Sequence, residues 1–253
     1  MVDSRCSRWL NIRQVARMIL PQLLWRFLRH RDDPVFYSMQ ADDSIRWLEA
    51  NQVRPCQGSR ALDVGCGHGI FGGALRKKGW TVTFADESNQ LLPELRSEEH
   101  RTFDLDADRF DRLGQYDLVI CSNVFEHLSQ PNRFLREAHE LLTPDGRLYL
   151  SWTNWLSPWG GHEFAPFHYL GTQLGPAVYD RISRRPRFHF PGKNLFPTHI
   201  GRTLRQIREF SQLSLVAGAP RYYTEFAPLI RVPVAREFLA WNCALLLKRR
   251  IPR

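Results

Sequence analysis

A short apolar run that ends in three alternating glycines constrains the fold more than any other stretch. Residues 60–71 read Arg-Ala-Leu-Asp-Val-Gly-Cys-Gly-His-Gly-Ile-Phe, a strand-length segment followed by the start of a helix. Glycines let the backbone turn sharply and leave its amides open to a ligand, and the amides that begin the next helix face the same ligand. Asp63, beside this turn, can hold a ligand's ammonium group. The pattern predicts an α/β sheet with a ligand site at this loop.

Two classes of cofactor fit this loop. The order Asp-x-Gly-x-Gly-x-Gly over residues 63–69 resembles the first motif of class I S-adenosylmethionine (SAM) dependent methyltransferases. Residues 67–72 also fit Gly-x-Gly-x-x-Gly, the dinucleotide fingerprint. Asp86 follows a second expected strand, 80–85, and an acidic side chain there grips ribose hydroxyls in both classes. The loop and Asp86 therefore predict a nucleoside cofactor without deciding which one.

Residues 116–152 decide between the two classes. The segment 116–128 looks like the fourth strand and following loop of small-molecule methyltransferases, and a helix is expected at 131–142. Leu-Leu-Thr-Pro-Asp-Gly-Arg-Leu at 141–148 resembles a recurrent signature before the fifth strand of that family. The resemblance covers roughly residues 58–152. It implies a class I SAM-dependent methyltransferase of small-molecule type, similar to an uncharacterised bacterial branch, with a doubly wound, seven-stranded Rossmann-like sheet whose last strand is antiparallel.

The resemblance also implies which residues bind SAM. The glycine loop, the ends of the second and third strands, and the end of the fourth strand would contribute them. In this sequence they are Asp63, Gly65, Cys66, Gly67, Gly69, Asp86, Glu87, Asp104, Leu105, Ser122 and Asn123. A carboxylate near Asp104 would meet the adenine amino group, and Asp106 competes for that assignment.

The chain divides into an N-terminal helical cap, 1–55, and a methyltransferase domain, 56–253. A helix is expected at 8–30 with a break at Pro21, a second at 34–52 with Asp33 as its cap, and another at 88–97. After the fifth strand, residues 152–200 are dense in aromatics, His, Gly and Pro. This fold commonly inserts its substrate-binding segment there, so the insertion is expected to form the acceptor pocket.

Methylation of a hydroxyl requires a base that accepts its proton. His162 and His168 are the first candidates, with Glu163 as an orienting partner and His127 in reserve. Trp159 and Tyr169 are expected to face the same pocket. The alternative, a rigid aromatic flap without proton chemistry, stays open.

A metal is not expected at the loop after the fourth strand. Glu126-His127 resembles the Glu-x-x-Glu-His metal motif of quinone-biosynthesis O-methyltransferases, but Asn123 stands in the first Glu position. A divalent ion needs several oxygen or nitrogen ligands. Only two of the three ligands of that motif are present, which favours a role for Glu126 and His127 in shaping the cofactor loop.

We expect O-methylation of a small-molecule or lipid-linked acceptor. The loop 122–125 reads Ser-Asn-Val-Phe instead of Asn-Pro-Pro-Tyr, which marks methylation of amides and amines, including DNA adenine. Two alternatives remain: a nucleic-acid methyltransferase, and a SAM-binding protein without transferase activity. Residues 181–253 hold fifteen Lys or Arg against three Glu, and such a basic segment could track a nucleic-acid backbone, although a nucleic-acid partner is the less favoured expectation.

The remaining expectations concern location. Net charge is +9, and the basic N-terminal segment is either a lid over the pocket or a peripheral anchor on anionic membrane. The sequence shows no signal peptide and no uncharged run of bilayer length. Five separated cysteines predict reduced thiols and a cytoplasmic protein. The oligomeric state is left open.

Overall fold

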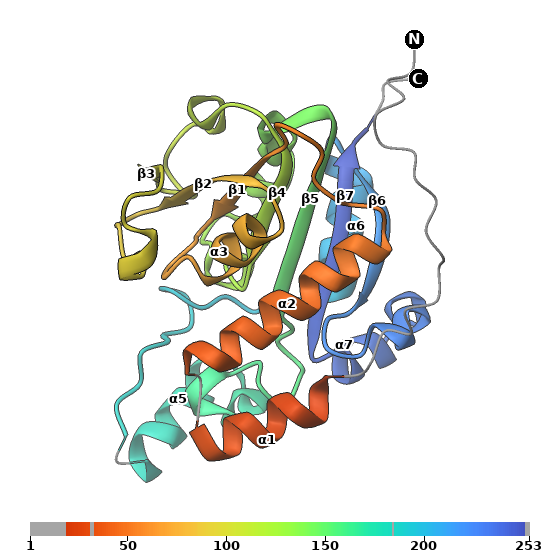
Figure 1. Ribbon diagram of the computed structural model, residues 1–253. Coiled ribbons are helices and arrows are strands. Elements are labelled where there is room, and N and C mark those ends of the chain that lie inside the picture. The colour runs from red at the N-terminus through yellow and green to blue at the C-terminus, as the bar shows by residue number, and fades with distance from the viewer. Residues whose placement is uncertain (1–18, 31–32, 184, 251–253) are drawn as a thin grey trace.

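A computed structural model describes residues 19–30, 33–183 and 185–250 of the chain. These residues form one seven-stranded sheet in the order β3-β2-β1-β4-β5-β7-β6 (Figure 1). The strands are β1 (Arg60–Val64), β2 (Thr81–Asp86), β3 (His100–Thr102), β4 (Tyr116–Ser122), β5 (Leu142–Thr153), β6 (Leu213–Pro220) and β7 (Asn242–Arg249). β1 to β5 pair in parallel, whereas β7 runs antiparallel to both β5 and β6. The predicted doubly wound sheet with an antiparallel last strand is confirmed.

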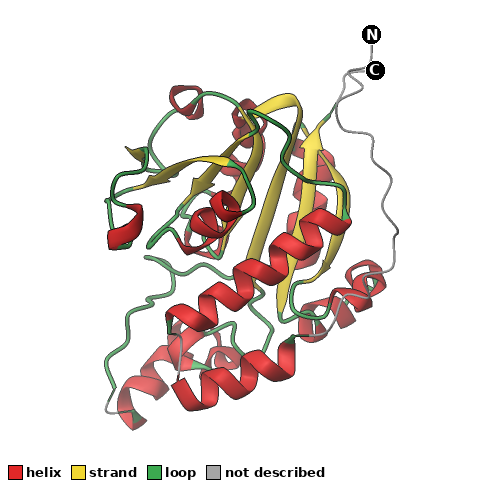
Figure 2. Cartoon of the chain, viewed as in Figure 1, coloured by secondary structure: helices red, strands yellow, loops and turns green. Residues whose placement is uncertain are grey.

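Helices cover both faces of this sheet (Figure 2). They are α1 (Leu20–His30), α2 (Pro34–Ala50), α3 (Ile70–Lys77), α4 (Pro131–Glu137), α5 (Gly171–Ile182), α6 (Ile200–Phe210) and α7 (Ala235–Leu239). None of the helices described is long and apolar enough to cross a membrane.

Two hydrophobic cores lie on the two faces of the sheet. Alternate residues of each central strand point to opposite faces, so Val119 packs with α4 and α6 while Ile120 packs with α2 and α3. Both strand residues are fully buried. Burial on both faces explains why the central strands read as continuous apolar runs.

The N-terminal helices follow the expected caps with one change. Asp33 caps α2 by accepting a hydrogen bond from the Phe36 amide at 2.9 Å, and Pro34 opens the helix. α1 begins at Leu20, so Pro21 lies in its first turn, where the missing N–H costs nothing, and does not break it. The part of the expected first helix at 8–18 lies outside the described residues.

The helix expected at 88–97 is wrong. Only a short 3₁₀ turn forms there, at Pro93–Leu95. Pro93 lacks an N–H and disfavours helical backbone at Leu92, and the Asn89 side chain accepts the Leu91 amide at 3.2 Å. The side chain therefore satisfies a donor that a helix would otherwise use.

The expectation of reduced cysteines holds only in part. Cys66, Cys121 and Cys243 are free thiols, and burial raises the pKa of each of the three thiols. Cys56, by contrast, is disulfide-bonded.

The insertion forms a layer at the edge of the sheet where the parallel strands end. After β5 the chain makes two 3₁₀ turns (His162–Phe164 and Phe167–Leu170) and α5. The segment has a small core of its own, built from Trp155, Phe164, Tyr179 and Leu195. Figure 1 shows α1 and α5 together below the strands, beside the carboxyl ends of the parallel strands. Ligands collect at that edge in α/β folds.

Candidate functional site

The glycine loop wraps closely around the end of β1. Gly65, Gly67 and Gly69 have φ of 64°, 50° and 75°, a region that residues with a Cβ rarely adopt. A Cβ at Gly65 would also lie 2.4 Å from Val124 Cγ2, whereas one at Gly67 would meet no atom within 4 Å. The glycine loop is therefore tight against the loop after β4 at Gly65 and open at Gly67, where a ligand could approach bare backbone.

Asp63 lies behind this loop. Its side chain is 3% exposed, and its Oδ2 accepts the Gly72 amide in the first turn of α3 at 2.8 Å. A Cβ at Gly72 would be 2.3 Å from Phe84 Cε1, so the helix approaches the carboxylate only because residue 72 is glycine. Burial raises the pKa of Asp63 to about 7.

Acidic side chains gather at the neighbouring strand ends. Asp86 ends β2, and its Oδ2 accepts the Gly67 amide at 2.8 Å. Burial, together with the charges of Asp104 and Asp86, raises the pKa of Glu87. These carboxylates offer acceptors to the hydroxyls and amino groups of a nucleoside, which is the donor set that SAM presents.

Asp104 and Asp106, the two candidates for binding the adenine amino group, differ in their hydrogen bonds. Both Asp106 oxygens accept backbone amides at the start of α4, from Ser129 at 2.8 Å and Gln130 at 2.9 Å. Asp104 uses Oδ1 to accept the Asp106 amide at 2.7 Å. Leu105 beside it is buried. Both carboxylate oxygens of Asp106 are already engaged at the start of α4. Asp104 is therefore the better candidate for the adenine amino group.

Asn123, one of the residues expected to bind the cofactor, belongs to a buried polar network. Its Oδ1 accepts hydrogen bonds from Arg221 at 3.0 Å and from Asn242 at 3.1 Å. Its backbone has φ of 56°, a left-handed conformation that Asn tolerates better than most residues. The neighbouring Ser122 hydroxyl accepts from Ser151 at 3.2 Å.

Arg221 is the centre of that network, and sequence reasoning missed it. The residue is 3% exposed, and its Nε donates to Ser44 Oγ in α2 at 3.1 Å. Tyr149 in β5 donates to the same hydroxyl at 2.8 Å. The network ties the cap to the ends of β4, β5 and β6. The one available signal was an arginine directly after the apolar run of β6.

Three histidines meet at the junction of the insertion and the loop after β4. His127 and His162 have ring centroids 5.2 Å apart, and His162 and His189 lie 4.4 Å apart. One ring nitrogen from each lies within 4.8 Å of the others. Burial first, then the neighbouring rings of His189 and His127, lowers the pKa of His162 to about 3. His162 is therefore neutral near pH 7.

Glu163 orients a histidine that the sequence analysis did not consider. Its Oε2 lies 2.6 Å from His189 Nδ1, and its Oε1 accepts the His189 amide at 2.6 Å. Oε1 also accepts the Phe188 amide. Although burial raises the pKa of Glu163, these hydrogen bonds outweigh it and the net pKa is lowered. The carboxylate fixes both the ring and the backbone of His189.

The other candidates of the insertion lie elsewhere. His168 is fully buried, its Nε2 is 3.0 Å from the Ser157 carbonyl oxygen, and its ring packs against Trp155 and Tyr169. This surrounding favours a packing role for His168. Trp159 contacts Phe27 of α1 edge to face at 6.2 Å between ring centroids, so the cap rests on the insertion there.

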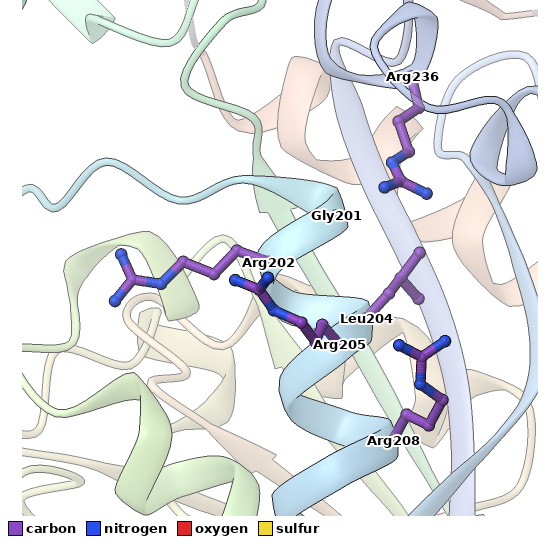
Figure 3. A pocket seen from close by; sticks show the side chains of 6 residues that line it. All are labelled: Gly201, Arg202, Leu204, Arg205, Arg208 and Arg236. Atoms are coloured by element: carbon purple, nitrogen blue, oxygen red, sulfur yellow. The ribbon is translucent and has the colours of Figure 1, made fainter.

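A separate surface pocket lies on α6, and none of the predicted site residues lines it. It has a volume of about 420 Å³ and is lined by Gly201, Arg202, Leu204, Arg205, Arg208 and Arg236. Figure 3 shows three of these arginines leaving α6 along its length, with Arg236 facing them from the side of α7. Its chemistry suits an anion more than an apolar acceptor.

Comparison with known proteins identifies the class that this fold and loop define. Residues 21–209 match the family model described as a methyltransferase domain. An uncharacterized methyltransferase of Mycobacteroides abscessus is 31% identical over 231 residues, covering 85% of this chain and 87% of that protein. The chain therefore belongs to the SAM-dependent methyltransferases, and the predicted family, enzyme class and cofactor are confirmed.

Solved structures show the same fold at low identity. A SAM-dependent methyltransferase from Clostridium acetobutylicum matches with a TM-score of 0.55 and 12% identity, covering 91% of this chain and 97% of that one. The 1,6-didemethyltoxoflavin-N1-methyltransferase of Burkholderia thailandensis, with its substrate and S-adenosylhomocysteine bound, matches with a TM-score of 0.53 and 15% identity, covering 97% and 93%.

Proposed function

We propose that this methyltransferase transfers the methyl group to a hydroxyl oxygen of an apolar small-molecule or lipid-linked acceptor. SAM supplies an electrophilic methyl, and the chain positions the acceptor and excludes water. The observation that carries the proposal is the histidine cluster, His127, His162 and His189, of which His127 lies in the loop that follows the carboxyl end of β4. A hydroxyl must lose its proton during methylation, and this cluster can take it up.

Within the cluster, His189 is the side chain best held for that task. Glu163 holds Nδ1 of His189 at 2.6 Å, which leaves the other ring nitrogen to face an acceptor. A positioned general base contributes about 10²- to 10⁴-fold in rate. We therefore assign Glu163 to orient His189, and His162 and His127 to the walls around it.

Exposed apolar side chains beside the cluster favour an apolar acceptor. Phe188 and Phe190 flank His189 and are 71% and 40% exposed, and Leu174 on α5 is 57% exposed. Arg187 lies over the Phe190 ring at 4.4 Å, which orients that ring. Neighbouring exposed apolar side chains rimmed by polar residues are a common feature of binding sites.

The chemical shift of the transferred methyl carbon identifies the atom that accepts the methyl group. Purified full-length protein is incubated with SAM carrying a carbon-13 methyl group and with separated aqueous and lipid extracts. We expect a labelled product whose methyl carbon has the chemical shift of a methyl ether or ester, in the apolar fraction. A label on nitrogen or carbon would contradict O-methylation, and a label confined to highly polar metabolites would contradict the apolar acceptor.

Paired phenylalanine variants test the acceptor surface. Phe188→Ala removes an apolar contact, so the acceptor KM should rise while the affinity for S-adenosylhomocysteine stays unchanged. Phe210→Ala on α6 is the matched control, because Phe210 is 68% exposed but lies outside the insertion. Equal acceptor KM values for the two variants would show that Phe188 does not contact the acceptor.

The arginine pocket on α6 supports a second candidate, a nucleic-acid acceptor. Four arginine side chains line it, and neutralising phosphates with such side chains makes binding strongly dependent on salt. The test is retention of the protein on oligonucleotides across a salt series, with Arg202→Ala and Arg205→Ala compared with wild type. Salt-independent or absent retention excludes this candidate.

A further inference from the structure

We propose that His127, His162 and His189 bind one divalent transition-metal ion, with Zn²⁺ as the best match. The proposal deepens the proposed function and rests on it only for the fate of the acceptor's proton. Metal binding itself stands on the geometry of these three side chains. They come from the loop after β4, from the first 3₁₀ turn of the insertion, and from the segment after α5.

The spacing of the cluster is close to that of a metal site. One nitrogen from each ring lies within 4.8 Å of the other two. Nitrogens bound to a tetrahedral Zn²⁺ at about 2.0–2.1 Å lie roughly 3.4 Å apart. The nitrogens must therefore close by at most roughly 1.4 Å to bind the ion, which small side-chain rotations can supply.

Two of the rings are already oriented in the way that metal ligands usually are. Nδ1 of His189 pairs with the Glu163 carboxylate at 2.6 Å, and Nδ1 of His127 lies 2.7 Å from the Asn194 carbonyl oxygen. Histidine ligands commonly donate one ring N–H to a carboxylate or carbonyl, which leaves the lone pair of the other nitrogen for the ion. Nε2 is then the ligand atom of His127 and His189.

The loop that carries His189 is itself braced. The Asn194 side chain accepts the Phe190 amide at 2.7 Å and donates to the Phe188 carbonyl at 2.9 Å. Glu163 holds the same loop through the amides of Phe188 and His189. A ligand on a loop needs such support, because a site that is loose by an ångström binds weakly.

His162 supplies an independent observation. Its Nδ1 is buried without a hydrogen-bond partner, an arrangement that normally costs free energy. Coordination to an ion removes that cost. His162 also has a positive φ of 50°, a strained conformation that brings the ring beside His127 and His189.

The ligand type selects the ion. Three imidazole ligands suit Zn²⁺ and similar first-row ions, whereas Mg²⁺ and Ca²⁺ prefer oxygen ligands. Glu126 is not among the described side chains that could hold the ion together; its Oε1 accepts the Thr153 amide at 2.8 Å, and its Oε2 is buried without a hydrogen-bond partner. The site thus differs from the Glu-x-x-Glu-His pattern considered from the sequence, and shares only His127 with it.

Three protein ligands leave a tetrahedral ion one free position. An acceptor hydroxyl bound there would lose its proton to bulk water more readily, because the ion would stabilise the oxyanion that forms. All three imidazoles would then act as ligands, and solvent would replace His189 as the proton acceptor. A metal site next to Phe188 and Phe190 would take the hydroxyl of an apolar acceptor.

The test uses the full chain. After removal of metal with a chelator, the protein is titrated with ZnCl₂ by calorimetry, and Co²⁺ absorption reports the ligand geometry. We expect one ion per chain with a tetrahedral Co²⁺ spectrum. Binding should be lost in His162→Ala and His189→Ala, and should weaken by about 10- to 100-fold in Glu163→Gln, which removes only an orienting charge.

His139→Ala is the matched control, because His139 lies outside the three-histidine cluster and its Nδ1 is 2.8 Å from the Arg136 carbonyl oxygen. Affinity for S-adenosylhomocysteine confirms that each variant is folded, and Glu163→Gln keeps the test decisive if an alanine variant does not fold. Absence of a stoichiometric ion, or equal binding by His189→Ala and His139→Ala, overturns the site.

The two proposals can fail separately. Metal binding without O-methyl product in the presence of acceptor extracts would overturn the proposed function and leave the site intact. If the titration detects no bound ion and the chelator-treated protein still methylates oxygen at the full rate, the metal site is overturned and the proposed function is left intact.

Discussion

Asp86 lies at the end of β2 with its carboxylate on the glycine loop, and we expect it to accept the ribose hydroxyls of SAM. Asp86→Ala removes a charged acceptor, so the affinity for S-adenosylhomocysteine should fall by about 1.5–3 kcal/mol. Calorimetry measures the change. Asp111→Ala is the control, because Asp111 pairs with Arg109 on the surface at 2.5 Å. An Asp86→Ala variant that binds S-adenosylhomocysteine with wild-type affinity would contradict the assignment of Asp86 to the ribose hydroxyls.

Asp63 makes cofactor binding depend on pH. Its pKa in the folded chain is about 7, above the ordinary value of 3.8, so the free protein holds this proton below about pH 7. A ligand ammonium favours the ionised carboxylate. Affinity for S-adenosylhomocysteine should therefore rise from about pH 5.5 to about pH 7, by at most roughly tenfold per pH unit, and then level off.

Two measurements control for this dependence: the binding profile of an Asp63 variant, and the pH dependence of the stability of the protein without cofactor. Asp63→Asn should bind more weakly with a flat profile over the same range, and a wild-type profile without slope contradicts the role of Asp63. In the protein without cofactor, a raised pKa means that the stability contributed by Asp63 is greatest at low pH. That stability is lost as pH rises from about 4 to about 7.

At the scale of the element, α1 packs on the insertion, as expected of a lid. The Ile19 amide donates to the Tyr222 carbonyl at 3.2 Å, Leu23 is buried, and Phe27 contacts Trp159. Phe27→Ala should lower the free energy of unfolding by about 1–2 kcal/mol and raise the acceptor KM. Leu28→Ala, at a position 81% exposed, should change stability by less than about 0.5 kcal/mol. Urea denaturation measures both.

The same pair of variants separates a lid from a membrane anchor. The exposed large apolar side chains of α1 are Trp25, at 54%, and Leu28, and these would enter a membrane surface if the helix were an anchor. We expect no sedimentation of the protein with anionic vesicles. Salt-dependent sedimentation that Leu28→Ala weakens and Phe27→Ala preserves would favour the anchor.

At the scale of the whole molecule, the cap and the sheet share one core. Ala41, Ile45 and Leu48 of α2 are 2%, 3% and 1% exposed and pack on the sheet. Each larger side chain contributes about 1.5–3 kcal/mol when buried, against a total stability of about 5–15 kcal/mol. A chain of residues 56–253 should therefore lose cooperative thermal unfolding, whereas residues 31–253 should keep it. A folded 56–253 that binds S-adenosylhomocysteine would make the cap a separable domain.

The sequence by itself determined the sheet and the cofactor loop. Positive φ at Gly65, Gly67 and Gly69 is a local property, and the glycines encode it directly. The central strands are apolar runs, and the family resemblance implied their doubly wound arrangement. The family resemblance then identified the class. The helix expected at 88–97 failed because Pro93 and the Asn89 side chain stop a helix within a few residues.

Only the tertiary structure decided which side chains of the insertion meet. His127, His162 and His189 are far apart in the chain, and packing of the insertion against the loop after β4 brings their rings together. Glu163 reaches His189 and not the neighbouring His162 for the same reason. Arg221 likewise contacts α2 only through the closed fold. Local sequence specifies local backbone, whereas such contacts depend on how distant segments close onto one core.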